Sequence, residues 1–276
     1  EKDFLKENYA KNGSKYCANI LGAKPERITL MSNDLGLTLS DETSKKIKRN
    51  AMIEFSDKRD YDSYNVNPSQ FLKIETPEVA YILGFIWADG HVRKHKNANT
   101  IKIDVNTKDF EELEKVFNKT GKWNYYHYIR RERFKSTTVV TNNRLIVDFL
   151  IKADYKTKSE CSPEKILNEI PKKLIYYFFR GFSDGDGCFY KKQKISRFTL
   201  ASSYEQDWSS VESVLNYLEV DFTIKRNINK VGHKHSVLTI SNKDSIVKWG
   251  NYIYQNYENE DIGFKRKYDK FLQISM

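Results

Sequence analysis

The chain contains 276 residues, with Lys+Arg 47 against Asp+Glu 37 and a formal net charge of +10 at pH 7. Hydrophobic residues make up 39% and aromatic residues 14% of the chain, which supports a packed core and argues against a chain that is disordered throughout. The longest apolar run, 79–88, is far shorter than the roughly 20 residues that a membrane helix needs. The 3 cysteines show no metal-ligand spacing. We therefore expect a protein of the cytoplasm or an organellar matrix, not secreted and without a membrane partner.

In chain order, the first predicted elements are two helices, 15–21 and 26–34, separated by a turn at Gly22. This pattern resembles a helix-turn-helix, in which the second helix would be the recognition helix on DNA. A helical extension that only packs on the protein is the alternative, because the pattern is loose. We expect the helix-turn-helix-like domain to span 1–44 and a basic linker to span 45–75.

Two similar segments follow the linker. YILGFIWADGHV, at 81–92, returns as FFRGFSDGDGCF at 178–189. Each segment starts as an apolar helix, ends on an acidic residue followed by glycine, and continues into a basic stretch with the alternation of strands. The segments downstream also repeat, so each half is predicted as helix, hairpin, helix, hairpin, helix. We predict two duplicated halves, 76–168 and 169–276.

The basic residues concentrate in the four predicted hairpins, at 93–102, 130–135, 191–197 and 225–234. Only the second of these stretches contains an acid, Glu132. Solvated strand faces would normally mix the two signs of charge. The one-sided charge favours a nucleic-acid partner, because Lys and Arg neutralise phosphates.

The ends of the two apolar helices carry the residues with the clearest chemistry. Small residues recur at one-turn spacing in each helix, which allows two helix backbones to approach closely. These residues are Gly84 and Ala88 in the first helix and Gly181 and Gly185 in the second. Such packing would place Asp89 and Asp186 side by side. Paired carboxylates suit a phosphodiesterase that uses a divalent metal, Mg²⁺ or Mn²⁺, to activate water. A single Asp-Gly would instead be an ordinary helix end, but the duplication favours the metal site.

The segments ILGFIWADG and FRGFSDGDG resemble the two motifs of LAGLIDADG homing endonucleases in their single-chain, two-motif form. The resemblance covers 76–276 and implies an α+β fold, a duplicated αββαββα saddle with the motif helices at the interface of the halves. It further implies a monomeric enzyme that makes a double-strand break in a long, asymmetric DNA target. In this family cleavage crosses the minor groove, depends on a divalent metal and leaves 3′ overhangs.

The resemblance also implies site residues. Asp89 and Asp186 match the metal-binding acids, and the carbonyl oxygens of Ala88 and Gly185 match further metal ligands. One departure from the family pattern is Trp87, which stands where the family commonly has an acid. We interpret Trp87 as a packing residue.

A basic residue usually supports each active site in the family. TKSECSPEKILNEIP, ahead of the second motif helix, points to Lys158, and GFKRKYDKF near the C-terminus points to Lys267. Both residues are therefore candidate catalytic lysines. Ordinary solvated lysines remain the alternative.

Strand alternation nominates the residues that would read DNA. Ile101, Ile103 and Val105 are expected to face the helices, so the residues between them face outward. Outward side chains in the hairpins can bond to base edges, while contact with phosphates alone is the alternative. The candidates are Arg93, His95, Lys102, Asp104 and Arg130 in the first half, and Tyr190, Lys192, Lys194, Thr199 and Lys225 in the second.

Three functions remain open from the sequence. The first is the site-specific endonuclease, with double-stranded DNA as partner and Mg²⁺ or Mn²⁺ as cofactor. The second is a maturase that binds the RNA of its host intron, and the third is a DNA-binding regulator that does not cleave. The intact pair of acids favours the first.

Overall fold

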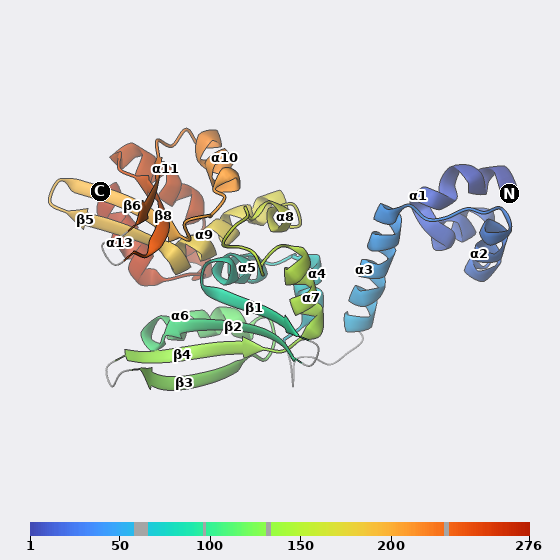
Figure 1. The fold of residues 1–276 in the computed structure, drawn as a ribbon, viewed down its shortest axis with the longest axis horizontal. Helices are drawn as coiled ribbons and strands as arrows, with labels where there is room; N and C mark the ends of the chain where they lie inside the picture. Colours follow the sequence, from blue (N-terminus) through green and yellow to red (C-terminus); the bar gives the residue numbers. More distant parts are fainter. Residues whose placement is uncertain (58–65, 96–97, 131–133, 229–231) are drawn as a thin grey trace. The chain divides into compact units, whose positions relative to one another are not determined.

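The structure, a computed structural model, describes residues 1–57, 66–95, 98–130, 134–228 and 232–276. The chain divides into two compact units, Glu1–Arg59 and Asp60–Met276, which are described separately (Figure 1). Within the described residues, no helix is both long enough and apolar enough to cross a membrane.

The first unit consists of three helices, α1 (Lys2–Leu21), α2 (Pro25–Asp34) and α3 (Asp41–Asp57). Gly13 interrupts α1 with a positive φ of 77°, and Gly22 ends it in the left-handed conformation that favours glycine. The helices enclose a small core of Leu5, Tyr9, Cys17, Ala18 and Ile28.

The two helices predicted at 15–21 and 26–34 fall within the second part of α1 and within α2. Helix α3 crosses the predicted domain boundary at residue 44. The predicted linker, 45–75, therefore includes most of a helix, and its segment 58–65 lies outside the described residues. DNA reading by this unit stays a prediction.

The second unit is built from two halves with the same order of elements. After α4 (Pro68–Lys73), the first half contains α5 (Pro77–Asp89), β1 (Gly90–His95), β2 (Ala98–Asn106), α6 (Thr107–Asn118), β3 (Asn124–Arg130), β4 (Phe134–Thr141) and α7 (Arg144–Lys152). The second half contains α9 (Ile175–Asp186), β5 (Gly187–Lys192), β6 (Ile195–Ser202), α10 (Ser209–Tyr217), β7 (Thr223–Ile228), β8 (Lys234–Ile240) and α11 (Lys243–Ile253). Short helices connect or follow the halves, namely α8 (Glu164–Leu167), η1 (Lys172–Leu174), α12 (Tyr257–Glu260) and α13 (Lys265–Ser275).

Each half contains one four-stranded antiparallel sheet, in the orders β1-β2-β4-β3 and β5-β6-β8-β7. Helices α5, α6 and α7 pack on the first sheet, and α9, α11 and α13 pack on the second. The predicted α+β fold with duplicated αββαββα halves is confirmed.

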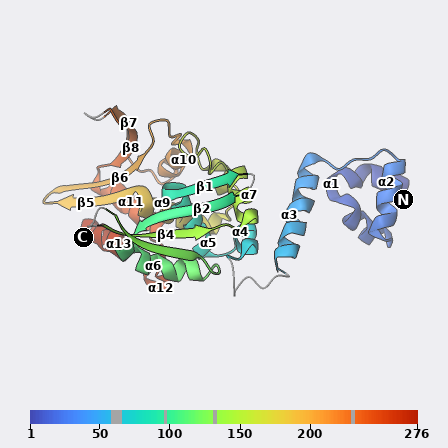
Figure 2. The ribbon, with the colours of Figure 1, turned by 60° about the horizontal axis from the view of Figure 1, so that its bottom comes forward.

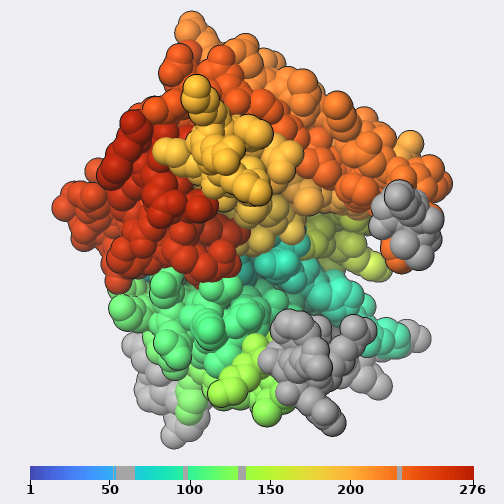
Figure 3. All heavy atoms as spheres, turned by 90° about the vertical axis from the view of Figure 1, so that its left-hand side faces the viewer, coloured from blue at the N-terminus to red at the C-terminus, as the bar shows by residue number. Residues whose placement is uncertain are grey.

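Helices α5 and α9 form the contact between the halves, and two views show them side by side between the sheets (Figures 1 and 2). A Cβ added to Gly84 would lie 1.9 Å from the backbone oxygen of Phe178. A Cβ added to Gly181 would lie 2.1 Å from the backbone oxygen of Tyr81. The backbones therefore touch where the sequence places its glycines, as predicted. The space-filling view shows the second half, yellow to red, directly above the first half, cyan to green (Figure 3).

Local sequence explains where α5 begins. Thr76 caps its N-terminus by accepting a hydrogen bond from the backbone N–H of Val79, and Pro77 occupies the first turn. All residues from Val79 to Trp87 are buried, as expected for a helix that is apolar on every side.

Candidate functional site

Asp89 and Asp186 are the last residues of α5 and α9, and the close packing of the helices brings these ends together. A Cβ added to Gly185 would lie 2.2 Å from the Cβ of Ala88 and 3.2 Å from Oδ2 of Asp89. The absence of a side chain at Gly185 therefore keeps the space beside the Asp89 carboxyl open. The structure thus brings together the four residues that the sequence nominates as metal ligands.

The two carboxyl groups share one electrostatic environment. Burial away from water raises the pKa of Asp186 to about 7, and the negative charge of Asp89 adds to this effect. The positive charges of Lys158 and Lys267 oppose the shift. Burial also raises the pKa of Asp89, and the same two lysines oppose this shift. Because the charge of one acid disfavours ionisation of the other, a bound cation would relieve the repulsion between them.

Lys158 reaches the end of α5 from the segment between α7 and α8. Its Nζ donates hydrogen bonds to the carbonyl oxygens of Ile86 (3.0 Å), Trp87 (2.5 Å) and Ala88 (2.6 Å). These carbonyls belong to the last turn of the helix, and of the three only Ile86 also accepts a hydrogen bond from the capping N–H of Gly90 among the described residues. The lysine therefore caps α5 and places a positive charge beside both carboxylates.

Lys267 performs the same task for α9 from helix α13. Its Nζ donates to the carbonyl oxygens of Ser183 (3.0 Å), Asp184 (2.5 Å) and Gly187 (2.7 Å). Unlike the solvated lysine of the alternative interpretation, Lys267 is buried. A cation at a helix C-terminus is stabilised by the helix dipole.

The donor set fits a hard divalent cation. In the described part of the chain, neither Asp89 nor Asp186 makes a side-chain hydrogen bond or ion pair, so both keep their oxygens available. Among the described residues, no cluster of three or more His, Cys, Asp and Glu side chains could hold a metal. Two carboxylates with main-chain carbonyls and water match Mg²⁺, which usually takes one or two carboxylates and retains several waters.

Trp87 and Asp184 occupy equivalent positions in the two motif helices but have different surroundings. The Trp87 ring packs against Tyr155, with ring centroids 5.0 Å apart, and against Phe178. Asp184 is buried and accepts hydrogen bonds from the Tyr81 hydroxyl (2.8 Å) and the backbone N–H of Phe264 (2.9 Å). The structure thus agrees with the interpretation of Trp87 as a packing residue.

Arg180, which no sequence pattern nominated, supports the second motif helix from inside. Its guanidinium donates to the carbonyl oxygens of Ile253 (2.7 Å), Ile262 (2.9 Å) and Gln255. Arg180 is fully buried and also stacks over the ring of Tyr177. An arginine inside an otherwise apolar helix was the signal that could have found it.

The candidate base readers lie where strand alternation places them. In the first half, Arg93, His95, Lys102 and Asp104 project from the face opposite the buried Ile101 and Ile103. Arg130 pairs with Phe134 at the end of β3, and its side chain lies outside the described residues.

The second sheet repeats this arrangement. The antiparallel register places four candidate readers on the face opposite the buried Phe198 and Leu200. These residues are Tyr190, Lys192, Thr199 and Lys225, while Lys194 lies in the turn between β5 and β6.

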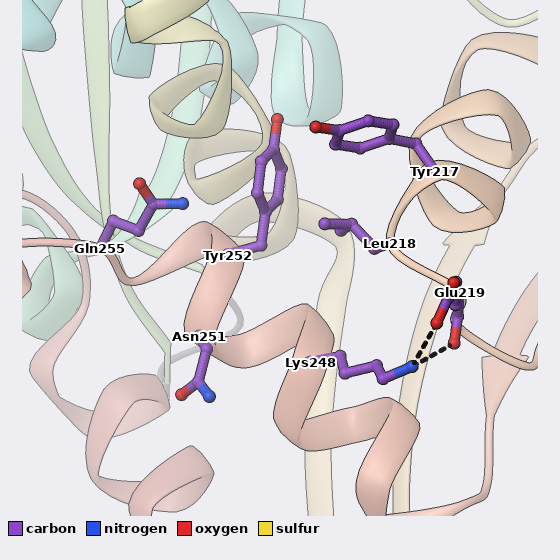
Figure 4. Close-up of a pocket in the computed structure, with 7 residues that line it drawn as sticks. All are labelled: Tyr217, Leu218, Glu219, Lys248, Asn251, Tyr252 and Gln255. Carbon is purple, nitrogen blue, oxygen red and sulfur yellow. Dashed lines mark hydrogen bonds and ion pairs between the residues drawn. The ribbon is translucent and has the colours of Figure 1, made fainter.

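A separate surface hollow lies between α10 and α11 (Figure 4). It has a volume of about 460 Å³, and Tyr217 and Tyr252 line it. An ion pair between Lys248 and Glu219 (3.5 Å) lies at its edge. None of the residues nominated from the sequence lines this hollow.

Comparison with known proteins gives a family match for the second half. Residues 173–254 match the profile described as a LAGLIDADG-like domain, which confirms the predicted resemblance for that part of the chain. No curated protein sequence matches the chain.

Solved structures that match the chain include two homing endonucleases and a meganuclease. I-WcaI bound to its DNA recognition sequence is 16% identical, and the match covers 87% of this chain and 96% of that chain with a TM-score of 0.49. The meganuclease I-SmaMI bound to uncleavable DNA is 16% identical, with coverage of 72% and 90% and a TM-score of 0.44. I-DmoI in complex with DNA and calcium is 20% identical, with coverage of 64% and 88% and a TM-score of 0.41.

Proposed function

Residues 173–254 carry a LAGLIDADG-like domain, and from this premise we propose that the protein is a site-specific DNA endonuclease. The observation that carries the proposal is the convergence of Asp89 and Asp186 at the ends of two crossing helices, each capped by a lysine. Each acid is followed directly by the first strand of a sheet with basic hairpins. This arrangement supports phosphodiester hydrolysis on a bound duplex.

Asp89 and Asp186, with the main-chain oxygens of Ala88 and Gly185, would hold Mg²⁺ or Mn²⁺. The metal supplies an activated water and stabilises the charge on the leaving oxygen. Lys158 and Lys267 hold the ends of the motif helices and thereby position the two carboxylates. Their charges also favour the approach of a phosphate to a site that otherwise contains two acids.

The duplication supports cleavage of both strands by one chain. Each half supplies one acid, one lysine and one sheet, as two strands of a duplex require. Since the two sheets carry different side chains, the target is long and asymmetric. We further propose that a monomer cuts across the minor groove and leaves 3′ overhangs, as the family resemblance implies.

The first unit is proposed as an additional DNA contact. On α3, Lys45, Lys46 and Lys48 are exposed, and on α2 the side chains of Arg27 and Thr29 are exposed. Lysines on one helix can neutralise phosphates next to the site that the sheets bind. This contact would lengthen the footprint on DNA.

Cleavage of a randomised library of duplex targets tests the proposal. Wild-type protein with Mg²⁺ is expected to cut a small set of related sequences, and removal of the metal with EDTA is expected to stop cleavage. The Asp89→Asn/Asp186→Asn double variant serves as the control for a contaminating nuclease. Specific binding without cutting would indicate the regulator, and binding to intron RNA alone would indicate the maturase.

A further inference from the structure

An acid stands on the otherwise basic, outward face of the first sheet. Asp104 lies in β2, and its Oδ2 pairs with Nζ of Lys102 at 3.1 Å. Both side chains remain accessible, with exposed fractions of 43% for Lys102 and 32% for Asp104. The residues between and beside them, Ile103 and Ile101, are buried against the helices.

The Asp104 carboxylate is held in place by its neighbours across the sheet. Its Oδ1 accepts hydrogen bonds from the hydroxyl of Tyr128 (3.2 Å) and from the hydroxyl of Thr138. Burial alone would raise the pKa of Asp104, but the hydrogen bonds from Thr138 and Lys102 outweigh it and lower the pKa. Asp104 is therefore a fixed, ionised acceptor with a lysine donor beside it.

The second half lacks this cluster. Gly90 pairs with Ile103 in the first sheet, and Gly187 pairs with Leu200 in the second, which aligns the two hairpins. Ala201 therefore takes the place of Asp104. The other replacements follow from the same register: Thr199 stands for Lys102 and Val237 stands for Thr138. The acceptor thus belongs to one half of the molecule only.

A carboxylate on a DNA-facing surface repels phosphates, so its favourable partner in a duplex is a base amino group. In the major groove, guanine presents the acceptors N7 and O6, and its paired cytosine presents the N4 amino donor. A lysine next to a carboxylate matches this order of two acceptors followed by a donor. An A·T pair instead places its donor between two acceptors, so the lysine could use only one of them.

Resting on the proposed function, we infer that Lys102 and Asp104 together read one G·C base pair in the half-site bound by the first sheet. Lys102 donates to guanine O6 and N7, and Asp104 accepts from cytosine N4. Tyr128 and Thr138 hold the carboxylate toward the base. The equivalent base pair in the other half-site is read by Thr199 and Ala201, which provide a hydroxyl and methyl groups.

The test is a base-by-base binding scan on the target recovered from the library, with Ca²⁺ in place of Mg²⁺ to prevent cleavage. Every base pair of the half-site is changed in turn, and affinity is measured for wild type, Lys102→Ala, Asp104→Ala and Asp104→Asn. Glu164→Ala is the matched control, because it removes an exposed acid on α8 that has no place in the cluster. Thermal unfolding of each variant confirms that it folds.

Wild type should prefer G·C at one position by roughly 10- to 100-fold over other base pairs. Asp104→Ala, Asp104→Asn and Lys102→Ala should reduce that preference at the same position and leave the other positions unchanged. The inference would be overturned if a folded Asp104 variant changed its affinity equally for all the targets, with the same base preferences as Glu164→Ala. The inference would also be overturned if the base pair at which the Lys102 and Asp104 variants lose their preference were A·T in the wild-type target. Absence of sequence-specific binding by wild type would instead contradict the proposed function itself.

Discussion

The ends of the two motif helices are equivalent in chemistry but are built from different local structure. Lys158 caps α5 from an irregular segment before α8, whereas Lys267 caps α9 from helix α13. Each lysine takes the carbonyls of the last turn of its helix, beside an aspartate that ends that helix. The duplication has thus kept a positive charge at a fixed place in space, although the local fold that supplies it differs.

The interiors of the same two helices differ more strongly. Helix α5 packs with apolar side chains such as Leu83, whereas α9 carries Arg180 and Asp184, both buried in hydrogen-bonded contacts with the C-terminal region. At these positions, the first motif helix depends on the packing of apolar side chains, and the second depends on a buried polar network. Substitutions at equivalent positions of the two helices should therefore differ in their effect on the free energy of unfolding.

Substitution of either glycine at the crossing should have the largest effect, because both halves depend on it equally. In Gly84→Ala the new Cβ would overlap the backbone oxygen of Phe178, 1.9 Å away, so the helices must separate. We expect a loss of about 3 kcal/mol or more in the free energy of unfolding, measured by chemical denaturation. Tyr217→Ala, at a position 84% exposed, is the control and should change stability by less than about 0.5 kcal/mol. Equal stability of both variants would refute the close contact.

Substitution of Arg180 should destabilise one half through its polar network. Arg180→Met removes the donors to three carbonyl oxygens and one of the two cations near Asp184, while Lys267 remains. The expected cost is about 2–3 kcal/mol in the free energy of unfolding, because buried carbonyl oxygens lose their donor. The equivalent change in the first half, Leu83→Met, should cost less than about 1.5 kcal/mol. Similar losses for both variants would contradict the difference between the halves.

Removal of the capping lysines should slow cleavage in addition to lowering stability. Lys158→Met and Lys267→Met each leave helix-end carbonyls without a donor and remove a charge beside the two acids. Cleavage of the selected target should slow by about 100-fold for either variant. Lys165→Met, which removes an exposed lysine that pairs with Asp154, should cleave like wild type. The account fails if only one of the two capping lysines matters.

The smallest effect is expected from the first unit. Replacing Lys45, Lys46 and Lys48 of α3 with alanine removes exposed charges without touching the paired acids. If these lysines bind phosphates, affinity should depend less steeply on salt, by a change in logarithmic slope of about 0.9 for each phosphate that is no longer neutralised. An unchanged slope in a filter-binding titration would show that these lysines of α3 do not neutralise phosphates.

The sequence predicted the parts of the site that repeat. The duplicated motif located Asp89 and Asp186, and the glycines in it predicted the close packing of the helices. Strand alternation assigned Lys102 and Asp104 to the same outward face. These features depend on residues close together in the chain, which is why a pattern can find them.

Other parts of the site depend on contacts between distant segments. Arg180 and Asp184 are explained by carbonyl and N–H groups at Ile253, Ile262 and Phe264, which no local pattern pairs with α9. Likewise, Thr138 reaches the acid of β2 because β4, rather than β3, is its neighbour in the sheet. Such pairings follow from the topology and are absent from any single segment.

The central claim is that Asp89 and Asp186 form one cleavage centre on bound DNA. The most direct test measures cleavage with Mg²⁺ and binding with Ca²⁺ on the selected target, for wild type and for Asp186→Asn. The account predicts that the variant binds within about threefold of wild type, a difference of less than about 0.7 kcal/mol, and cleaves at least about a thousandfold more slowly. Cleavage at the wild-type rate by the folded variant would contradict it.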